Sequence, residues 1–163
     1  MSKESAELRR YEDDLYICGK GAVIMGIWCV VKGVLQIFLT SIRDMIDNVA
    51  KDEGLIPQAK AIVFIFLLIM VVLMTLAHIY SGVNAMKAAR GKKYRKGYLA
   101  VSVVLIVIFL GGLPFYKIFF EDEDAVYSVI PSIITDLTTV YLLAVIIKSA
   151  RKIKQLKQMR EES

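Results

Sequence analysis

Two ionisable side chains lie deep inside long apolar stretches of this sequence. Lys32 falls near the middle of an apolar run over residues 17–42, and Asp136 falls near the middle of another over residues 128–148. A charge at the centre of a lipid bilayer costs about 2.5 kcal/mol or more, so each side chain would need a partner or water. Such residues often mark the path of an ion, a proton or a substrate. We therefore predict that Lys32 and Asp136 meet in the core of a membrane helix bundle.

The positions of the two charges within their runs agree with such a pair. Lys32 comes twelve residues after Lys20, and Asp136 comes twelve residues before Lys148. At a helical rise of ~1.5 Å per residue, both charges would lie ~18 Å from the basic ends of their helices. The pair could be an ion or substrate site, or a structural clasp that fixes how two helices pack. A third alternative is that the two side chains do not meet.

Further polar side chains accompany the two charges at helical spacing. Gln36 follows Lys32 by four residues, Ser132 precedes Asp136 by four, and Thr139 follows Asp136 by three. The single histidine, His78, could relay protons near neutral pH, or it could be a hydrogen-bonded packing residue near the lipid headgroups. The predicted ion or substrate site therefore comprises Lys32, Asp136, Gln36, Ser132, Thr139 and His78.

Enzyme chemistry has little support in this sequence. Cys18 and His78 could act as nucleophile and base of a membrane cysteine hydrolase, but no local signature accompanies them, and buried single cysteines are usually small hydrophobes. Cys18 and Cys29 would lie ~16 Å apart along one helix, too far for a disulfide. The sequence carries no phosphate-binding loop, dinucleotide fingerprint or zinc-ligand spacing. We expect a protein that is not an enzyme and that holds no metal or cofactor.

Four apolar helices would be needed to position the predicted site. The chain has 163 residues, of which 56% are hydrophobic, more than a soluble domain of this size usually carries. Apolar runs long enough to cross the ~30 Å hydrocarbon core of a bilayer recur along it. We place the helices at roughly 17–42, 58–89, 97–119 and 126–158. The prediction is an all-α fold, a four-helix transmembrane bundle that forms a single domain over residues 1–163.

Shorter features flank these four segments. Residues 1–16 have apolar side chains at helical spacing and predict either a short helix on the membrane surface or a solvated terminus. Residues 43–56 predict a second short interfacial helix. We expect Gly91 to cap the second long helix, and Gly111, Gly112 and Pro114 to kink the third.

The distribution of basic residues predicts the orientation in the membrane. Sixteen of the 21 Lys and Arg residues fall on one side of the predicted bundle and four on the other, while Lys32 lies within the first helix. Cytoplasmic segments carry the excess of positive charge, so both termini should face the cytoplasm. The Lys- and Ile-rich composition is typical of a bacterial plasma membrane protein. The formal net charge of +5 therefore indicates membrane topology and not nucleic-acid binding.

Three kinds of partner follow from this arrangement. The glycine stripe of Gly19, Gly26 and Gly33 offers a close-packing face for a homo-oligomer. The basic C-terminal tail could dock on a partner protein. Basic clusters at the cytoplasmic boundary could contact anionic lipid headgroups. Those clusters contain Lys87, Arg90, Lys92, Lys93, Arg95, Lys96, Arg151 and Lys152.

Two functional classes remain open on these grounds. One is a small transporter or channel in which Lys32 and Asp136 form the ion, proton or substrate site. The other is a non-transporting membrane protein, such as an accessory subunit, a scaffold or an immunity protein, in which the same pair is a structural clasp.

Overall fold

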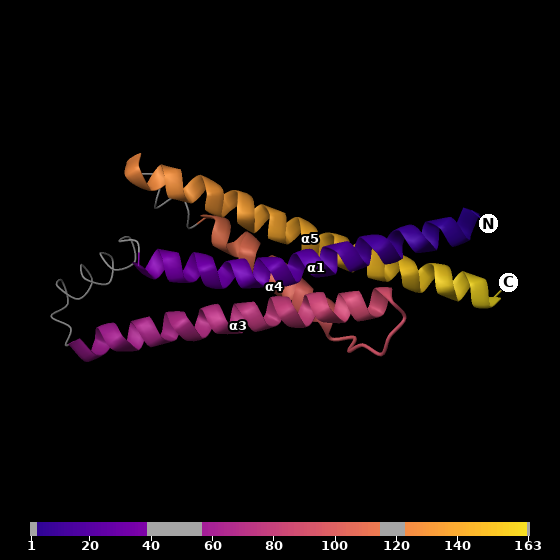
Figure 1. The fold of residues 1–163 in the computed structure, drawn as a ribbon, viewed down its shortest axis with the longest axis horizontal. Coiled ribbons are helices and arrows are strands. Elements are labelled where there is room, and N and C mark those ends of the chain that lie inside the picture. The colour runs from indigo at the N-terminus through magenta and orange to yellow at the C-terminus, as the bar shows by residue number, and fades with distance from the viewer. Residues whose placement is uncertain (1–2, 39–56, 115–122, 163) are drawn as a thin grey trace. The chain divides into compact units, whose positions relative to one another are not determined.

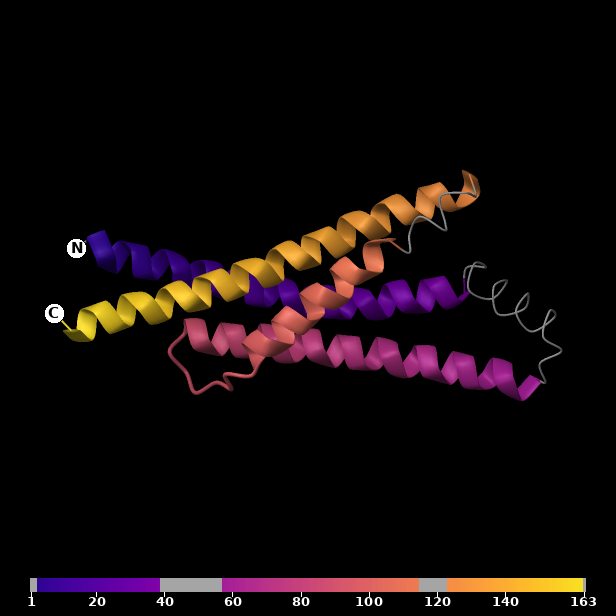
Figure 2. The same cartoon turned by 180° about the vertical axis from the view of Figure 1, so that it is seen from behind.

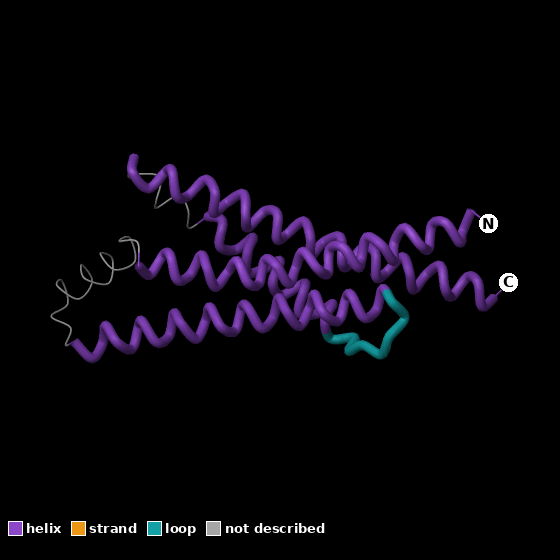
Figure 3. Tube along the Cα trace, in the orientation of Figure 1, coloured by secondary structure: helices purple, strands orange, loops and turns teal. Residues whose placement is uncertain are grey.

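A computed structural model describes residues 3–38, 57–114 and 123–162 of the chain, and helices account for most of them (Figure 1). The helices are α1 (Lys3–Phe38), α3 (Pro57–Ala89), α4 (Tyr98–Gly112) and α5 (Glu123–Glu162). The described residues contain no strand, and Figure 3 shows helix throughout them except in the segment between α3 and α4. The predicted all-α class is therefore confirmed for this part of the chain, which contains four helices, whereas a bundle of four membrane-spanning helices stays a prediction.

Three of the four helices are long and apolar enough to cross a membrane. The qualifying segments are Ser5–Gly33 in α1, Phe64–Ala89 in α3 and Ile130–Glu161 in α5. At ~1.5 Å per residue, the 40-residue α5 is ~60 Å long, about twice the thickness of a hydrocarbon core. A large part of α5 would therefore extend beyond any bilayer that it crossed.

The third helix is shorter than the sequence predicted. α4 has 15 residues and ends at Gly112, not near residue 119. Leu113 and Pro114 form a tight 3₁₀ turn in which the Leu113 amide donates to the Leu110 carbonyl. Gly111, Gly112 and Pro114 lie at this end of α4, and the predicted kink and continuation of the helix stay predictions. The rest of the predicted helix 97–119 lies outside the described residues.

The N-terminal segment also differs from the prediction of a separate surface helix. Residues 3–16 are helical, but they continue without a break into the first apolar run as part of α1. Neighbouring helices supply the reason, because Leu15 is buried and Glu12 forms an ion pair with Lys157 of α5. The predicted interfacial helix at 43–56 lies outside the described residues.

Gly91 ends α3 as the sequence predicted. Its φ of +65° is a left-handed conformation that costs glycine little. The Gly91 amide donates to the Ala88 carbonyl at 3.1 Å, and the Lys92 amide donates to the Lys87 carbonyl at 2.9 Å. These two bonds are the pattern of a Schellman cap, which satisfies the last carbonyls of a helix. The basic loop 92–97 therefore leaves α3 in a defined direction.

The chain divides into two compact units, residues 1–23 with 78–163, and residues 24–77. In the first unit, α1 and α3 approach so closely that a Cβ added at Gly19 would lie 2.9 Å from the Gly82 carbonyl oxygen. A Cβ added at Gly21 of α1 would lie 3.0 Å from the side chain of Leu142 of α5. α4 packs along α5, and both views of the ribbon show them side by side (Figures 1 and 2). Small residues on α1 thus hold it against two neighbours.

The second unit consists of the later part of α1 and the earlier part of α3. A Cβ added at Gly33 would lie 2.9 Å from the side chain of Val71. Most other large apolar side chains of this unit are exposed, including Ile62 (66%) and Phe66 (60%). Gly19 and Gly33, which the sequence offered as an oligomer face, therefore already pack against α3 of their own chain; oligomerisation through that stripe stays a prediction.

Candidate functional site

Seven polar or ionisable side chains are buried among the described residues, and all of them belong to the unit formed by residues 1–23 and 78–163. Burying a polar group costs free energy unless it is hydrogen-bonded, so each one requires a structural or functional reason. The seven are His78, Ser81 and Asn84 of α3, Ser102 of α4, and Asp136, Thr139 and Ser149 of α5.

Two fully buried hydroxyl groups join α3 to α4. Ser81 and Ser102 are hydrogen-bonded to each other through their Oγ atoms. The Ser102 hydroxyl lies 2.9 Å from the Tyr98 carbonyl oxygen, and the Ser81 hydroxyl lies 3.5 Å from the same oxygen. Either hydroxyl can donate in the bond between the two serines, and the other one then donates to the Tyr98 carbonyl. Each hydroxyl proton is therefore used inside the protein, and the pair works as a clasp between the two helices.

Asn84 connects α3 to the basic loop that follows it. Its side-chain amide donates to the Tyr80 carbonyl at 2.8 Å, and its Oδ1 accepts from the Arg95 amide at 3.0 Å. One side chain thus satisfies a loop amide that would otherwise need water and adds a hydrogen bond to a helix carbonyl. The sequence analysis did not include Asn84, Ser81 or Ser102 in the predicted site. The only feature of the sequence that could have indicated these three residues is that each is polar within an otherwise apolar helix.

His78 is fully buried and packs against an aromatic ring of α4. The ring centroids of His78 and Phe109 lie 5.5 Å apart with an interplanar angle of 75°, an edge-to-face contact. Aromatic pairs favour this geometry. Of the two interpretations that the sequence left open, a packing histidine accounts for this placement directly.

The predicted residues of α5 are placed on its partly buried face. Asp136 is 9% exposed and Thr139 is 1% exposed, and the Thr139 hydroxyl donates to the Thr135 carbonyl at 2.9 Å. Ser132 is half-buried on the same helix. Lys32 belongs to the other compact unit, and the side chain of Gln36 lies outside the described residues. The Lys32–Asp136 pair therefore stays a prediction.

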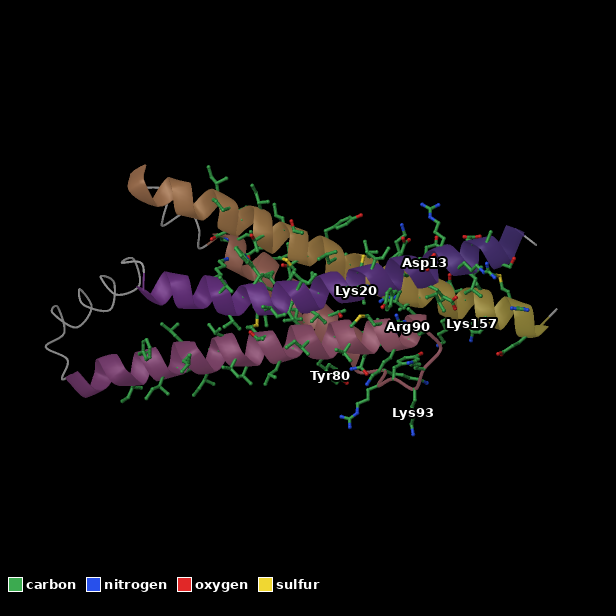
Figure 4. The ribbon with its side chains drawn as sticks, in the orientation of Figure 1. Asp13, Lys20, Tyr80, Arg90, Lys93 and Lys157 are labelled. Atoms are coloured by element: carbon green, nitrogen blue, oxygen red, sulfur yellow. The ribbon has the colours of Figure 1, made fainter. Side chains whose placement is uncertain are left out.

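A cluster of cations surrounds Tyr16 where the first turns of α1 meet the end of α3. The Arg90 guanidinium donates a hydrogen bond to the Tyr16 hydroxyl and lies 4.3 Å from the ring centroid. Lys20 Nζ lies 4.8 Å from the same centroid. Figure 4 shows Lys20 on α1, Arg90 at the end of α3 and Lys157 on α5. Both cation–π contacts hold positive charge against α1.

The predicted headgroup residues are therefore not equivalent. All eight are exposed, but Arg90 is also engaged with Tyr16. Lys93 extends from the loop between α3 and α4 (Figure 4). An ion pair between Lys157 Nζ and Glu12 Oε1, at 3.4 Å, joins the polar ends of α5 and α1.

Within the described ranges, no group of three or more His, Cys, Asp or Glu side chains could hold a metal ion. No family model, curated protein or solved structure matches the chain. Fold and site together define a class: the described residues are all-helical, include three helices compatible with a membrane, and bury polar side chains in the unit formed by residues 1–23 and 78–163.

Proposed function

We propose that this chain is a small integral membrane protein whose helices cross the bilayer with both termini in the cytoplasm. Exposed apolar surface supports this proposal in both compact units, since Ile62, Phe66, Val107 and Tyr141 are each at least 60% exposed. Apolar surface on this scale favours lipid over water. The excess of Lys and Arg at the termini and in loop 90–97 supports the orientation.

The polar ends of α1 and α5 would then project into the cytoplasm as paired helices. Leu15 and Ile153 are buried there, and the Glu12–Lys157 ion pair lies beside them. A helical projection held by its own packing is suited to contact another protein. This is the feature expected of an accessory subunit or scaffold.

We propose the non-transporting class for the role of the protein. The observation that carries this choice is the Ser81–Ser102–Tyr98 network, in which the buried hydroxyls of α3 and α4 bind each other and the backbone. A transport path needs polar groups that exchange partners with water or substrate. These hydroxyls serve instead to hold two helices together.

A transporter or channel is the second candidate, and Asp136 favours it. This carboxylate is 9% exposed and lies on the helix face that carries Thr139 and Ser132. An ionisable side chain inside a membrane segment is often part of an ion or proton path. Lys32, at the matching depth predicted from the sequence, would complete such a path.

Reconstitution into liposomes separates the two candidates. Proton, K⁺, Na⁺ and Cl⁻ fluxes are measured at several values between about pH 5 and pH 8, the range in which a histidine changes its charge. The non-transporting role predicts the flux of protein-free vesicles for the wild type and for Asp136→Asn. Flux above that background, abolished by Asp136→Asn and retained in the exposed control Asp13→Asn, would contradict it and establish transport.

A further inference from the structure

An open groove of about 450 Å³ lies between α4 and α5, the two helices that run side by side in Figure 2. Both helices belong to the same compact unit. One lining residue, Ile106, comes from α4. The other six come from α5 and are Ala144, Ile147, Lys148, Arg151, Lys152 and Gln155.

The lining changes from apolar to cationic along the helix axis. The six α5 residues recur at steps of three and four, so they share one helix face. Ile106, Ala144 and Ile147 form the apolar half. Three cations and Gln155 form the other half, and the distance from Ala144 to Gln155 along the helix is ~16 Å. The groove is therefore amphipathic.

The part of the chain that the structure describes places no carboxylate against the positive charge of the groove. No acidic residue lines it, and among the described residues no carboxylate forms an ion pair with Lys148, Arg151 or Lys152. Lys157, on the next turn of α5, differs because it pairs with Glu12 at 3.4 Å. Three cations beside an apolar channel are complementary to a ligand with an anionic head and an apolar chain.

We propose that this groove binds one anionic phospholipid of the cytoplasmic leaflet. The phosphate lies among Lys148, Arg151 and Lys152, and an acyl chain runs along Ile106, Ala144 and Ile147. The planar guanidinium of Arg151 can donate two parallel hydrogen bonds to phosphate oxygens, and the flexible lysines add charge. A soluble phosphate would leave the apolar half in water. The inference rests on the proposed insertion in a membrane.

The groove changes which residues are expected to contact a lipid headgroup. The sequence singled out Arg151 and Lys152 together with six residues of the end of α3 and its following loop. Only the two α5 residues line the groove, and the structure adds Lys148, Gln155 and the apolar half. The loop cations do not line the groove. Variants at these positions therefore serve as a matched control for non-specific charge attraction.

Lipid binding to the purified protein tests the cationic half of the groove. The affinities for phosphatidylglycerol and phosphatidylcholine are measured in neutral detergent by native mass spectrometry. Each cation near an anionic lipid contributes about fivefold, so Arg151→Gln with Lys152→Gln should weaken phosphatidylglycerol binding about 25-fold. The control, Lys92→Gln with Lys93→Gln, should retain wild-type affinity. Equal losses in both double variants would overturn the proposal, because attraction would then be non-specific.

A second pair of variants tests the apolar half without changing charge. Ala144→Phe fills the groove and, by excluding about two methylene groups of the chain, should weaken phosphatidylglycerol binding about tenfold. Ala100→Phe, at an exposed position of α4 outside the groove, should not. No effect of Ala144→Phe, or equally effective competition by inorganic phosphate, would overturn the lipid assignment. A changed oligomeric state in the groove variants, with lipid binding intact, would make the groove an interface between copies and would also overturn it.

A separate readout distinguishes failure of the inference from failure of the proposed function. The wild type and all four variants are incorporated into neutral phosphatidylcholine vesicles and washed with high salt and alkaline buffer. Retention in the vesicles, with no preference for phosphatidylglycerol, would overturn the groove assignment alone. Release of the wild-type protein would contradict membrane insertion itself.

Discussion

At the scale of single residues, the clearest feature is the way α3 and α4 use small hydroxyl side chains. Ser81 and Ser102 occupy little volume, are fully buried and lie within hydrogen-bonding distance of each other and of the Tyr98 carbonyl. Burying a hydroxyl without a hydrogen-bond partner in apolar surroundings costs free energy, so each serine offsets the burial cost of the other. The two positions should therefore be energetically coupled.

A double-mutant cycle measures that coupling. Ser81→Ala and Ser102→Ala should each lower the free energy of unfolding by about 1 kcal/mol, because each breaks the hydrogen bond between the two hydroxyls. The double variant should lose less than the sum of the two, since no hydroxyl is left without its partner. Unfolding in detergent, followed by the loss of helical circular dichroism, gives the values. Strict additivity would show that the two hydroxyls do not interact.

The sequence predicted which polar residues are buried better than it predicted which residues they contact. Buried His78, Asp136 and Thr139 were singled out because polar groups in an apolar helix must face protein. The Ser81–Ser102 pair was missed because its members lie 21 positions apart. Nothing in either helix alone indicates which face of α3 meets which face of α4. Pairings of this kind depend on helix rotation, which apolar runs of nearly uniform hydrophobicity do not specify.

At the scale of elements, glycine decides how α1 approaches its neighbours. Backbone atoms of Gly19 and Gly82 meet where α1 and α3 are closest, and a Cβ at Gly19 would lie 2.9 Å from a carbonyl oxygen. The obstacle is backbone and not a flexible side chain, so the two helices would have to separate. Gly111 near the end of α4 has no atom within 4 Å of such a Cβ and provides a control.

Gly19→Ala should therefore destabilise the protein by about 1–3 kcal/mol, the usual cost of forcing extra volume into a packed contact. Gly111→Ala should be neutral or stabilising by up to about 1 kcal/mol, because alanine is the better helix former. Thermal unfolding in detergent compares both variants with the wild type. If Gly19→Ala were as stable as Gly111→Ala, the close approach of α1 and α3 would be contradicted.

Helix boundaries were predictable where a single proline or glycine marks the end of the helix. Pro57 and Gly91 mark the two ends of α3, and the observed helix, Pro57–Ala89, differs from the predicted 58–89 by one residue. The end of α4 was not predictable in this way, since glycine and proline can either kink a helix in lipid or end it. The polar residues 3–16 likewise gave no sign that α1 is continuous, because that depends on α5 burying Leu15 and pairing with Glu12.

At the scale of the whole molecule, exposed apolar side chains and clustered cations belong to different parts of the chain. Exposed Ile, Phe and Val side chains cover both compact units, whereas the cations gather at the helix ends and in loop 90–97. These two features together support insertion with a fixed orientation. The lipid groove and the projecting ends of α1 and α5 both depend on that orientation.

Labelling of single cysteines in intact cells tests this central claim most directly. In a Cys18→Ala, Cys29→Ala background, cysteines are placed by Ser2→Cys, Lys93→Cys, Asp52→Cys and Ser163→Cys. A membrane-impermeant maleimide should label only Asp52→Cys, and the other three should react only after the cells are permeabilised. Labelling of Ser2→Cys or Ser163→Cys in intact cells, or of all four sites alike, would contradict a membrane-spanning bundle with both termini in the cytoplasm.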